Sequence, residues 1–170
     1  MKKTILVALL ATTLFACSTP AEKAAPAETD ATASSCVKEG PDVDLMNKAI
    51  TAYASGDWAT AASCFSDSAT SSHNNDTLAM KMSDRIELFK KQRESSGVVV
   101  DAGTPNLEVV TVPTTNEKYK DIKWGHAWIT FKNKSKTGEV RSSLTFAMFA
   151  IKDGKIIHEQ VIYDTKGLQN

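Results

Sequence analysis

The sequence of 170 residues predicts an α+β domain in which helices precede an antiparallel sheet. Apolar residues recur at helical spacing between residues 44 and 96 and then alternate with polar residues between 107 and 163. The pair Asp153-Gly154 separates two of the later apolar runs and is typical of a tight β-hairpin. Helices followed by a meander of strands is the element order of an α+β fold.

Three helices are expected in the first half of the domain. The first spans residues 44–55 and ends at Gly56, because glycine readily adopts the left-handed conformation that terminates a helix. Asp57 is expected to cap a second, shorter helix through its carboxylate. The third spans residues 83–96 and ends at Gly97.

The second half of the domain predicts strands separated by polar turns. The segment 140–151 is apolar on both faces in its second half, which indicates burial on both sides. A short extended segment is also expected between the second and third helices. The expected strands cover residues 69–73, 107–112, 122–131, 140–151 and 156–163.

The first seventeen residues predict export. Met1-Lys2-Lys3 is a basic start, and the apolar run from Ile5 to Phe15 is too short for a permanent membrane span. The end of this run, Leu14-Phe15-Ala16-Cys17, resembles the lipobox of bacterial lipoproteins. The resemblance implies that residues 1–16 are a signal peptide and that Cys17 is lipidated with fatty acyl chains such as palmitate.

The segment after the cysteine is expected to be a flexible tether. Residues 17–42 begin with the lipidated cysteine and are poor in large apolar side chains, so they cannot offset the entropy of ordering. Several acyl chains on one residue give a stable membrane anchor. Ser18 replaces the aspartate that resembles an inner-membrane retention signal. The protein is therefore expected in the cell envelope, on the outer membrane facing the periplasm, with a folded domain at 43–170.

The charge balance argues against nucleic acid as a partner. The chain has 20 basic and 20 acidic residues, and no basic stripe appears along it. The 3 histidines show no metal-ligand spacing, and there is no glycine-rich phosphate loop. Neither a metal nor another cofactor is therefore expected.

Two cysteines remain in the domain once Cys17 is lipidated. Cys36 and Cys64 could form a disulfide, since exported proteins fold in an oxidising compartment. The alternative is that Cys64, on an apolar helical face, is a buried free thiol.

Three stretches of the domain resemble the nuclear transport factor 2-like superfamily and its SnoaL-like branch, within the cystatin-like architecture. They are Ala52 to Trp58, with its Gly-Asp pair, Cys64 to His73, with Phe-Ser-Asp-Ser-Ala, and the terminal hairpin Asp153 to Asp164. The resemblance covers residues 43–164. It implies a cone-shaped, curved antiparallel sheet wrapped around the N-terminal helices, with a pocket on the concave side.

The candidate pocket residues come from the helices and from alternating strand positions. The resemblance suggests that Asp164 lies at the rim of the cone, where it could act as a general base. His126 is a second candidate base, between two tryptophans on one strand face. The sequence alone leaves open which face of strand 122–131 is concave, and a convex face would suit a dimer interface. The expected lining residues are Tyr53, Trp58, His73, Trp124, His126, Trp128, Phe146, Met148, Gln160 and Asp164.

Three functions are compatible with these features. The favoured one is a membrane-tethered, non-catalytic module whose cone binds a small apolar ligand or a protein partner. The alternative is a cofactor-free isomerase- or cyclase-like enzyme with Asp164 or His126 as the base. The third is a structural envelope protein that acts as a homodimer through its sheet, and a homodimer is the expected oligomer.

Overall fold

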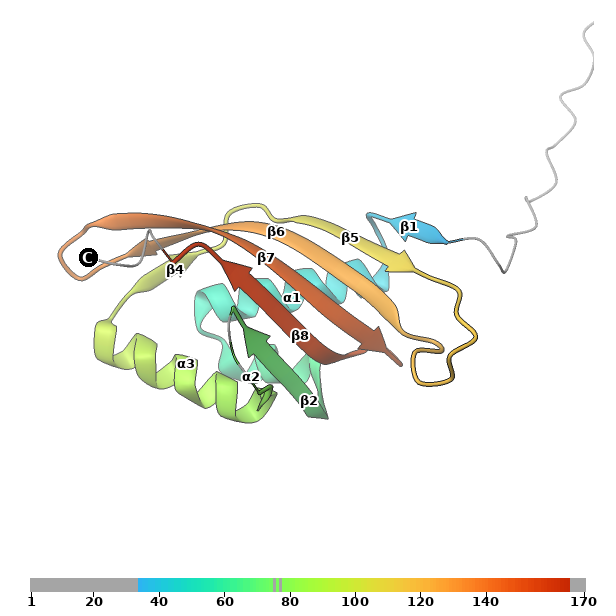
Figure 1. Ribbon diagram of the computed structural model, residues 1–170. Coiled ribbons are helices and arrows are strands. Elements are labelled where there is room, and N and C mark those ends of the chain that lie inside the picture. Colours follow the sequence, from blue (N-terminus) through green and yellow to red (C-terminus); the bar gives the residue numbers. More distant parts are fainter. Residues whose placement is uncertain (1–33, 75, 77, 166–170) are drawn as a thin grey trace, which may run out of the picture. The chain divides into compact units, whose positions relative to one another are not determined.

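The computed structural model describes residues 34–74, 76 and 78–165. Helices dominate the first half of the described chain and strands the second (Figure 1). The elements are β1 (Ser35–Val37), α1 (Pro41–Ser55), α2 (Trp58–Ser63), β2 (Phe65–His73), β3 (Met80–Lys81), α3 (Met82–Ser96), β4 (Val99–Asp101), β5 (Asn106–Thr111), β6 (Lys123–Lys134), β7 (Val140–Lys152) and β8 (Lys155–Tyr163).

The strands form one curved sheet in the order β1-β5-β6-β7-β8-β2-β3, and β4 pairs with β6. The strands β6 and β7 arch over α1, and α2 and α3 lie on the same side of the sheet (Figure 1). This architecture confirms the α+β prediction. The expectation of a wholly antiparallel sheet is wrong in one place, because β2 pairs with β8 in parallel.

The core lies between α1 and the concave face of the sheet. Met46 of α1 is completely buried, and it packs where β6 carries Gly125. A β-carbon at position 125 would lie 2.0 Å from the sulfur of Met46, so only glycine allows the helix to approach this closely. Gly125 stands opposite Val109 on one side and Phe149 on the other, which places the contact in the middle of the sheet.

The helix boundaries follow local signals in the sequence. Gly56 and Gly97 end α1 and α3 in the left-handed conformation, with φ of 79° and 60°, and the side chain of Asp57 accepts a hydrogen bond from the Thr60 amide at 3.0 Å. These predictions are confirmed. The first helix begins at Pro41, three residues earlier than expected, since proline suits the first turn of a helix.

The short strands β1, β3 and β4 were not expected. Each has three residues or fewer and no clear alternation, so pairing with a longer strand defines it rather than its own sequence. Pairing of β1 with residues 109–111 of β5 also corrects the expected tether, because residues 35–37 belong to the sheet. Within the described residues, no helix is long and apolar enough to cross a membrane.

The expected disulfide is absent, because Cys36 and Cys64 are both free thiols. Cys36 is exposed on β1, at one end of the sheet, and Cys64 is buried just before β2, beyond β5, β6, β7 and β8 in the strand order. The thiol of Cys64 donates instead to the carbonyl oxygen of Thr60 at 3.4 Å. The alternative of a buried thiol is therefore the correct one. Cys17 lies outside the described residues.

Candidate active site

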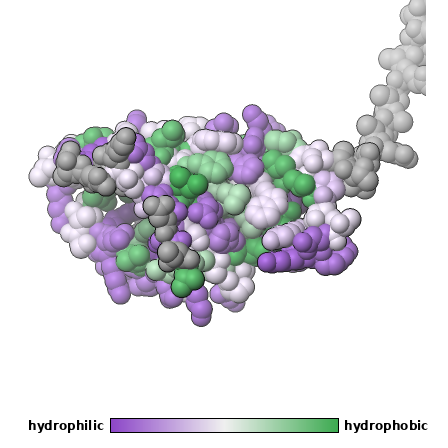
Figure 2. Space-filling model, viewed as in Figure 1, coloured by the Kyte–Doolittle hydropathy of each residue, from purple (hydrophilic) through white to green (hydrophobic). Residues whose placement is uncertain are grey.

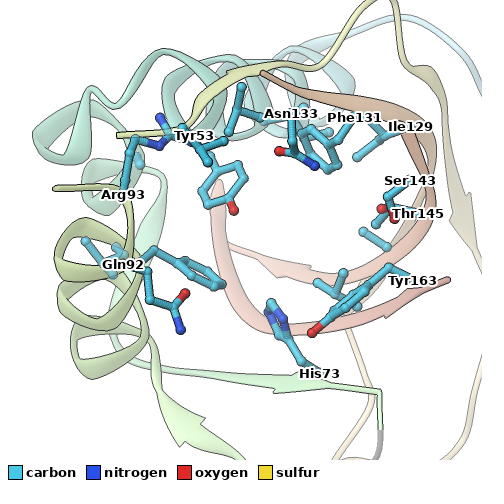
Figure 3. Close-up of a pocket in the computed structure, with 18 of the residues that line it drawn as sticks. Tyr53, His73, Gln92, Arg93, Ile129, Phe131, Asn133, Ser143, Thr145 and Tyr163 are labelled. Carbon is cyan, nitrogen blue, oxygen red and sulfur yellow. The ribbon is translucent and has the colours of Figure 1, made fainter. Parts of the chain in front are cut away.

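The concave side of the sheet and the three helices line an open cavity of about 550 Å³. Side chains from the helices form one wall and side chains from the sheet form the other (Figure 3). This volume lies in the range of sites that hold small molecules and cofactors.

The lining of the cavity changes from apolar to polar along β6 and β7. Every second residue of these strands faces inward, because side chains alternate across a sheet. Ile129 and Phe149 lie at the apolar end, near α1. The lining residues toward the β6–β7 turn are mostly polar: Asn133, Ser135, Glu139, Arg141 and Ser143. The cavity is therefore shaped for a molecule with an apolar body and a polar end.

A histidine–glutamate pair lies at the wall formed by β2 and β8. The Nε2 atom of His73 is 3.4 Å from Oε1 of Glu159, and the hydroxyl of Ser71 donates to the same oxygen at 2.9 Å. The parallel register of β2 and β8 produces this arrangement, since it sets Ser71 directly opposite Glu159. The two side chains of the pair are only 11 % and 14 % exposed, and Ser71 is completely buried.

A histidine in contact with a carboxylate is a suitable general base. A neutral imidazole that donates from Nε2 to a carboxylate keeps its lone pair on Nδ1, where it can accept a proton. Ser71 and His73 hold the carboxylate of Glu159 in one orientation, and the ring of Phe89 packs 5.3 Å from the imidazole. The surroundings therefore fix the position of both partners.

Two tyrosines bring hydroxyl groups to the same space. Tyr53 of α1 packs edge-on against Phe89 and Phe131, and Tyr163 of β8 packs edge-on against His73 at 6.0 Å. Figure 3 shows both tyrosines directed into the cavity. Burial raises the pKa of Tyr53 above its ordinary value, helped by the charge of Glu159 and opposed by Arg93. The Tyr53 hydroxyl is therefore a neutral hydrogen-bond donor at physiological pH.

The raised pKa of Tyr53 predicts the pH dependence of one phenol. An ultraviolet titration of phenolate formation is expected to show a late component, at a pH above the ordinary tyrosine value of 10.0, and Tyr53→Phe is expected to remove it. Since the pKa is raised by folding, its contribution to stability is complete below the unfolded value of 10.0 and is lost as the pH rises through the folded-state pKa. A late component that persists in Tyr53→Phe would contradict the assignment.

Three of the expected pocket residues line the cavity, and seven do not. Tyr53, Trp58 and His73 face it. Within the described chain, its lining contains none of Trp124, His126, Trp128, Phe146, Met148, Gln160 and Asp164.

The expected residues of β6, β7 and β8 lie outside the cavity because successive side chains of a strand point to opposite faces of the sheet. His126, Met148 and Gln160 stand opposite one another across β6, β7 and β8, and their neighbours Ala147 and Val161 are the residues that face inward. The strand face that carries His126 is therefore the outer face of the sheet, which corrects its placement in the pocket.

The two candidate bases have different surroundings from those expected. On the outer face, His126 lies 3.3 Å from Glu108 and packs against Trp128 and Phe146, in a cluster where Trp128 is 41 % exposed. Over β7 and β8, Figure 2 shows hydrophobic residues interspersed with hydrophilic ones.

Asp164 is exposed after β8, where its amide donates to the carbonyl of Leu144 at 3.3 Å. The expected homodimer stays a prediction.

Sequence reasoning missed Glu159, Ser71, Tyr163 and Arg93. The inward phase of β8 includes Glu159, Val161 and Tyr163, whereas the expected phase was that of Gln160 and Asp164. The contact of Ser71 with Glu159 can be recognised only when the parallel pairing of β2 with β8 is known. Among the described residues, no group of three or more histidine, cysteine, aspartate or glutamate side chains could hold a metal ion.

Solved structures show which fold this architecture is. One similar structure is that of a protein from Xanthomonas campestris pv. campestris that is assigned as a polyketide cyclase. Its TM-score is 0.58 and its sequence identity 14 %, and the match covers 75 % of this chain and 93 % of that chain. An NTF2-like protein from Burkholderia xenovorans has a TM-score of 0.53 and 10 % identity, over 75 % and 92 %. An LEH-like epoxide hydrolase from M. tuberculosis has a TM-score of 0.53 and 13 % identity, over 75 % and 89 %.

These likenesses show that the domain has the nuclear transport factor 2-like fold shared with SnoaL-like cyclases. No protein-family model matches the sequence, and no curated protein matches it. The assigned activities among the similar structures include those of a cyclase and a hydrolase, a finding that corrects the expectation of a non-catalytic binding module.

Proposed function

We propose that this protein is an enzyme of the isomerase or cyclase type that moves a proton on a small, largely apolar carbonyl compound. The observation that carries this proposal is the buried His73–Glu159 pair at the wall of a cavity that also receives the hydroxyl of Tyr53. A base within reach of the substrate and a neutral donor for its oxygen are the two groups that such a reaction requires.

The reaction is a proton transfer at the carbon next to the carbonyl. The carbonyl oxygen accepts a hydrogen bond from Tyr53, and the proton of the neighbouring C–H bond passes to the His73–Glu159 pair. The electron pair of that bond forms an enolate, whose negative oxygen the tyrosine stabilises. Where the enolate is conjugated with a double bond, it takes the proton back from the pair at a more distant carbon. Alternatively, its carbon attacks a second carbonyl of the same molecule and closes a ring, and the alkoxide left by that carbonyl takes the proton back from the pair. No oxidant or reductant is needed.

The rest of the cavity favours this chemistry. Ile86, Phe89 and Phe149 are among the apolar side chains that line it. Apolar walls exclude water, which would compete for the proton, and they strengthen the hydrogen bond to the developing enolate. The base named here replaces Asp164 and His126, neither of which lines the cavity.

Exchange of carbon-bound protons tests the proposal without knowledge of the natural substrate. The test compound is 2-tetralone, a bicyclic ketone with acidic protons beside its carbonyl. In deuterated buffer, nuclear magnetic resonance is expected to show loss of these protons at a rate proportional to protein concentration. Exchange no faster than with the His73→Asn, Glu159→Gln double variant would contradict the proposal.

We also propose that the enzyme is a lipoprotein of the cell envelope, anchored through Cys17. The support is the sequence alone, namely the basic start, the short apolar run and Leu14-Phe15-Ala16-Cys17. Residues 1–33 lie outside the described part of the chain. Mass spectrometry of the N-terminal peptide from the source cells is expected to show an acylated Cys17, and an unmodified Met1 in the mature protein would refute the anchor.

A further inference from the structure

Arg93 occupies a defined place in the cavity wall, next to Tyr53 and away from His73. It comes from the last turn of α3, and its guanidinium lies over the rings of Tyr53 and Trp58, at 5.3 and 5.0 Å from their centroids. Its Nη1 atom donates to the carbonyl of Ala54 at 3.1 Å, near the end of α1. Figure 3 shows Arg93 beside Tyr53, on a different side of the cavity from His73.

The position of the guanidinium is fixed by its neighbours. A β-carbon on Gly56, just after α1, would lie 3.2 Å from Nη1 of Arg93, so the glycine leaves the space that the guanidinium fills. Two aromatic faces and one helix end therefore hold a single arginine in place. A pre-positioned cation loses little entropy when it binds an anion, which is the property of a built binding group.

Among the described residues that line the cavity, the charged side chains other than Arg93 have a charged or titratable partner. Arg141 forms an ion pair with Glu139 at 2.8 Å, and Glu159 is contacted by His73. Among the described residues, Arg93 has no carboxylate within ion-pair distance. A guanidinium has five N–H donors, and Ala54 and Tyr53 take at most two of them. Most of its hydrogen-bonding capacity is therefore available to a ligand.

We propose that Arg93 binds a carboxylate group of the substrate, so that the enzyme acts on apolar molecules that carry one acid group. This inference rests on the proposed function, because it takes the cavity as the substrate site. The apolar body would lie toward Phe149 and Ile129, and the carboxylate would face the guanidinium. A carboxylate fits the fork of an arginine through two parallel hydrogen bonds. In the described part of the cavity lining, Arg93 is the one cation without a carboxylate partner, and a single positive charge favours a carboxylate over a doubly charged phosphate.

Binding of two matched compounds tests this inference separately from catalysis. The compounds are 2-naphthoate and 2-naphthamide, which share a ring system and differ in the charge of one group. Titration calorimetry of the full chain is expected to show about tenfold to a hundredfold tighter binding of the carboxylate. In Arg93→Gln this preference is expected to fall to about one, while the affinity for the amide changes little.

A control variant and two further measurements make the test specific. Lys91→Gln removes the same charge from an exposed position of the same helix and is expected to keep the preference. Arg93→Lys retains the positive charge but lacks the planar guanidinium that can donate two parallel hydrogen bonds. This variant is expected to keep part of the preference for the carboxylate. In the unaltered protein, added salt is expected to weaken the binding of 2-naphthoate more than the binding of 2-naphthamide. This measurement does not require any variant to fold.

Four results would overturn the inference: equal affinity for both compounds, binding of neither, an unchanged preference in Arg93→Gln, or tighter binding of 2-naphthyl phosphate than of 2-naphthoate. The proposed reaction fails in a different way. If 2-tetralone exchange is absent while the preference depends on Arg93, the carboxylate site stands and the proton-transfer chemistry is wrong. If exchange is present but the protein does not bind the carboxylate more tightly than the amide, the proton-transfer chemistry stands and the carboxylate site is wrong.

Discussion

Replacing Glu159 with glutamine is expected to lower the rate of proton exchange from 2-tetralone by at least about a hundredfold, the usual contribution of general-base catalysis. The amide has nearly the same shape, but it cannot carry the negative charge that the imidazole of His73 and the hydroxyl of Ser71 now contact. The substrate should still bind, because the apolar walls are unchanged. Steady-state exchange measurements are therefore expected to show a lower kcat with a nearly unchanged KM.

The protein contains a matched control for this change. On the outer face of the sheet, Glu108 lies 3.3 Å from His126, in a second histidine–glutamate pair. Glu108→Gln makes the same chemical change outside the cavity and is expected to leave exchange unaffected. A large loss in Glu108→Gln with full activity in Glu159→Gln would move the active site to the outer face and refute the assignment of His73.

Gly125→Ala is expected to destabilise the domain by about 1–3 kcal/mol, because the added methyl group overpacks the core. The new β-carbon would lie 2.0 Å from the sulfur of Met46 and 3.4 Å from a methyl group of Ile151. Since Met46 has no exposed surface, the helix α1 must shift away from the sheet or change the rotamer of this side chain. Urea unfolding followed by circular dichroism measures the loss.

A double variant separates this clash from other effects of the alanine. Met46→Ala alone leaves a cavity and is expected to cost about 2–5 kcal/mol. In Met46→Ala, Gly125→Ala the two changes compensate, so the double variant should be more stable than the sum of the single losses predicts. Additive losses would mean that the two residues are not in contact.

Local signals in the sequence predicted the C-terminal ends of α1 and α3, the cap of α2 and the last hairpin. Gly56 and Asp57 act through contacts within a few residues, and Asp153 and Gly154 take the positive φ angles of 50° and 69° that a tight hairpin requires. The conformations of such residues depend little on the rest of the chain. For this reason, these helix ends and the last hairpin could be predicted without knowledge of the fold.

The candidate site depended on information that lies far apart in the sequence. His126 between Trp124 and Trp128 looks like a pocket strand, but the small residues between them, Gly125 and Ala127, are the ones that face the helices. A shift of one residue exchanges the two faces of a strand. The functional pair also needs the parallel pairing of β2 with β8, between segments about 90 residues apart, which no local pattern indicates.

The crystal structure of the protein bound to 2-naphthol tests the central claim most directly. This planar phenol resembles the enol of 2-tetralone and so represents the intermediate of the proposed reaction. We expect the ring inside the cavity, with its oxygen within hydrogen-bond distance of the Tyr53 hydroxyl and its neighbouring carbon against His73 and Glu159. A naphthol bound instead on the outer face, against His126 and Trp128, would contradict the account.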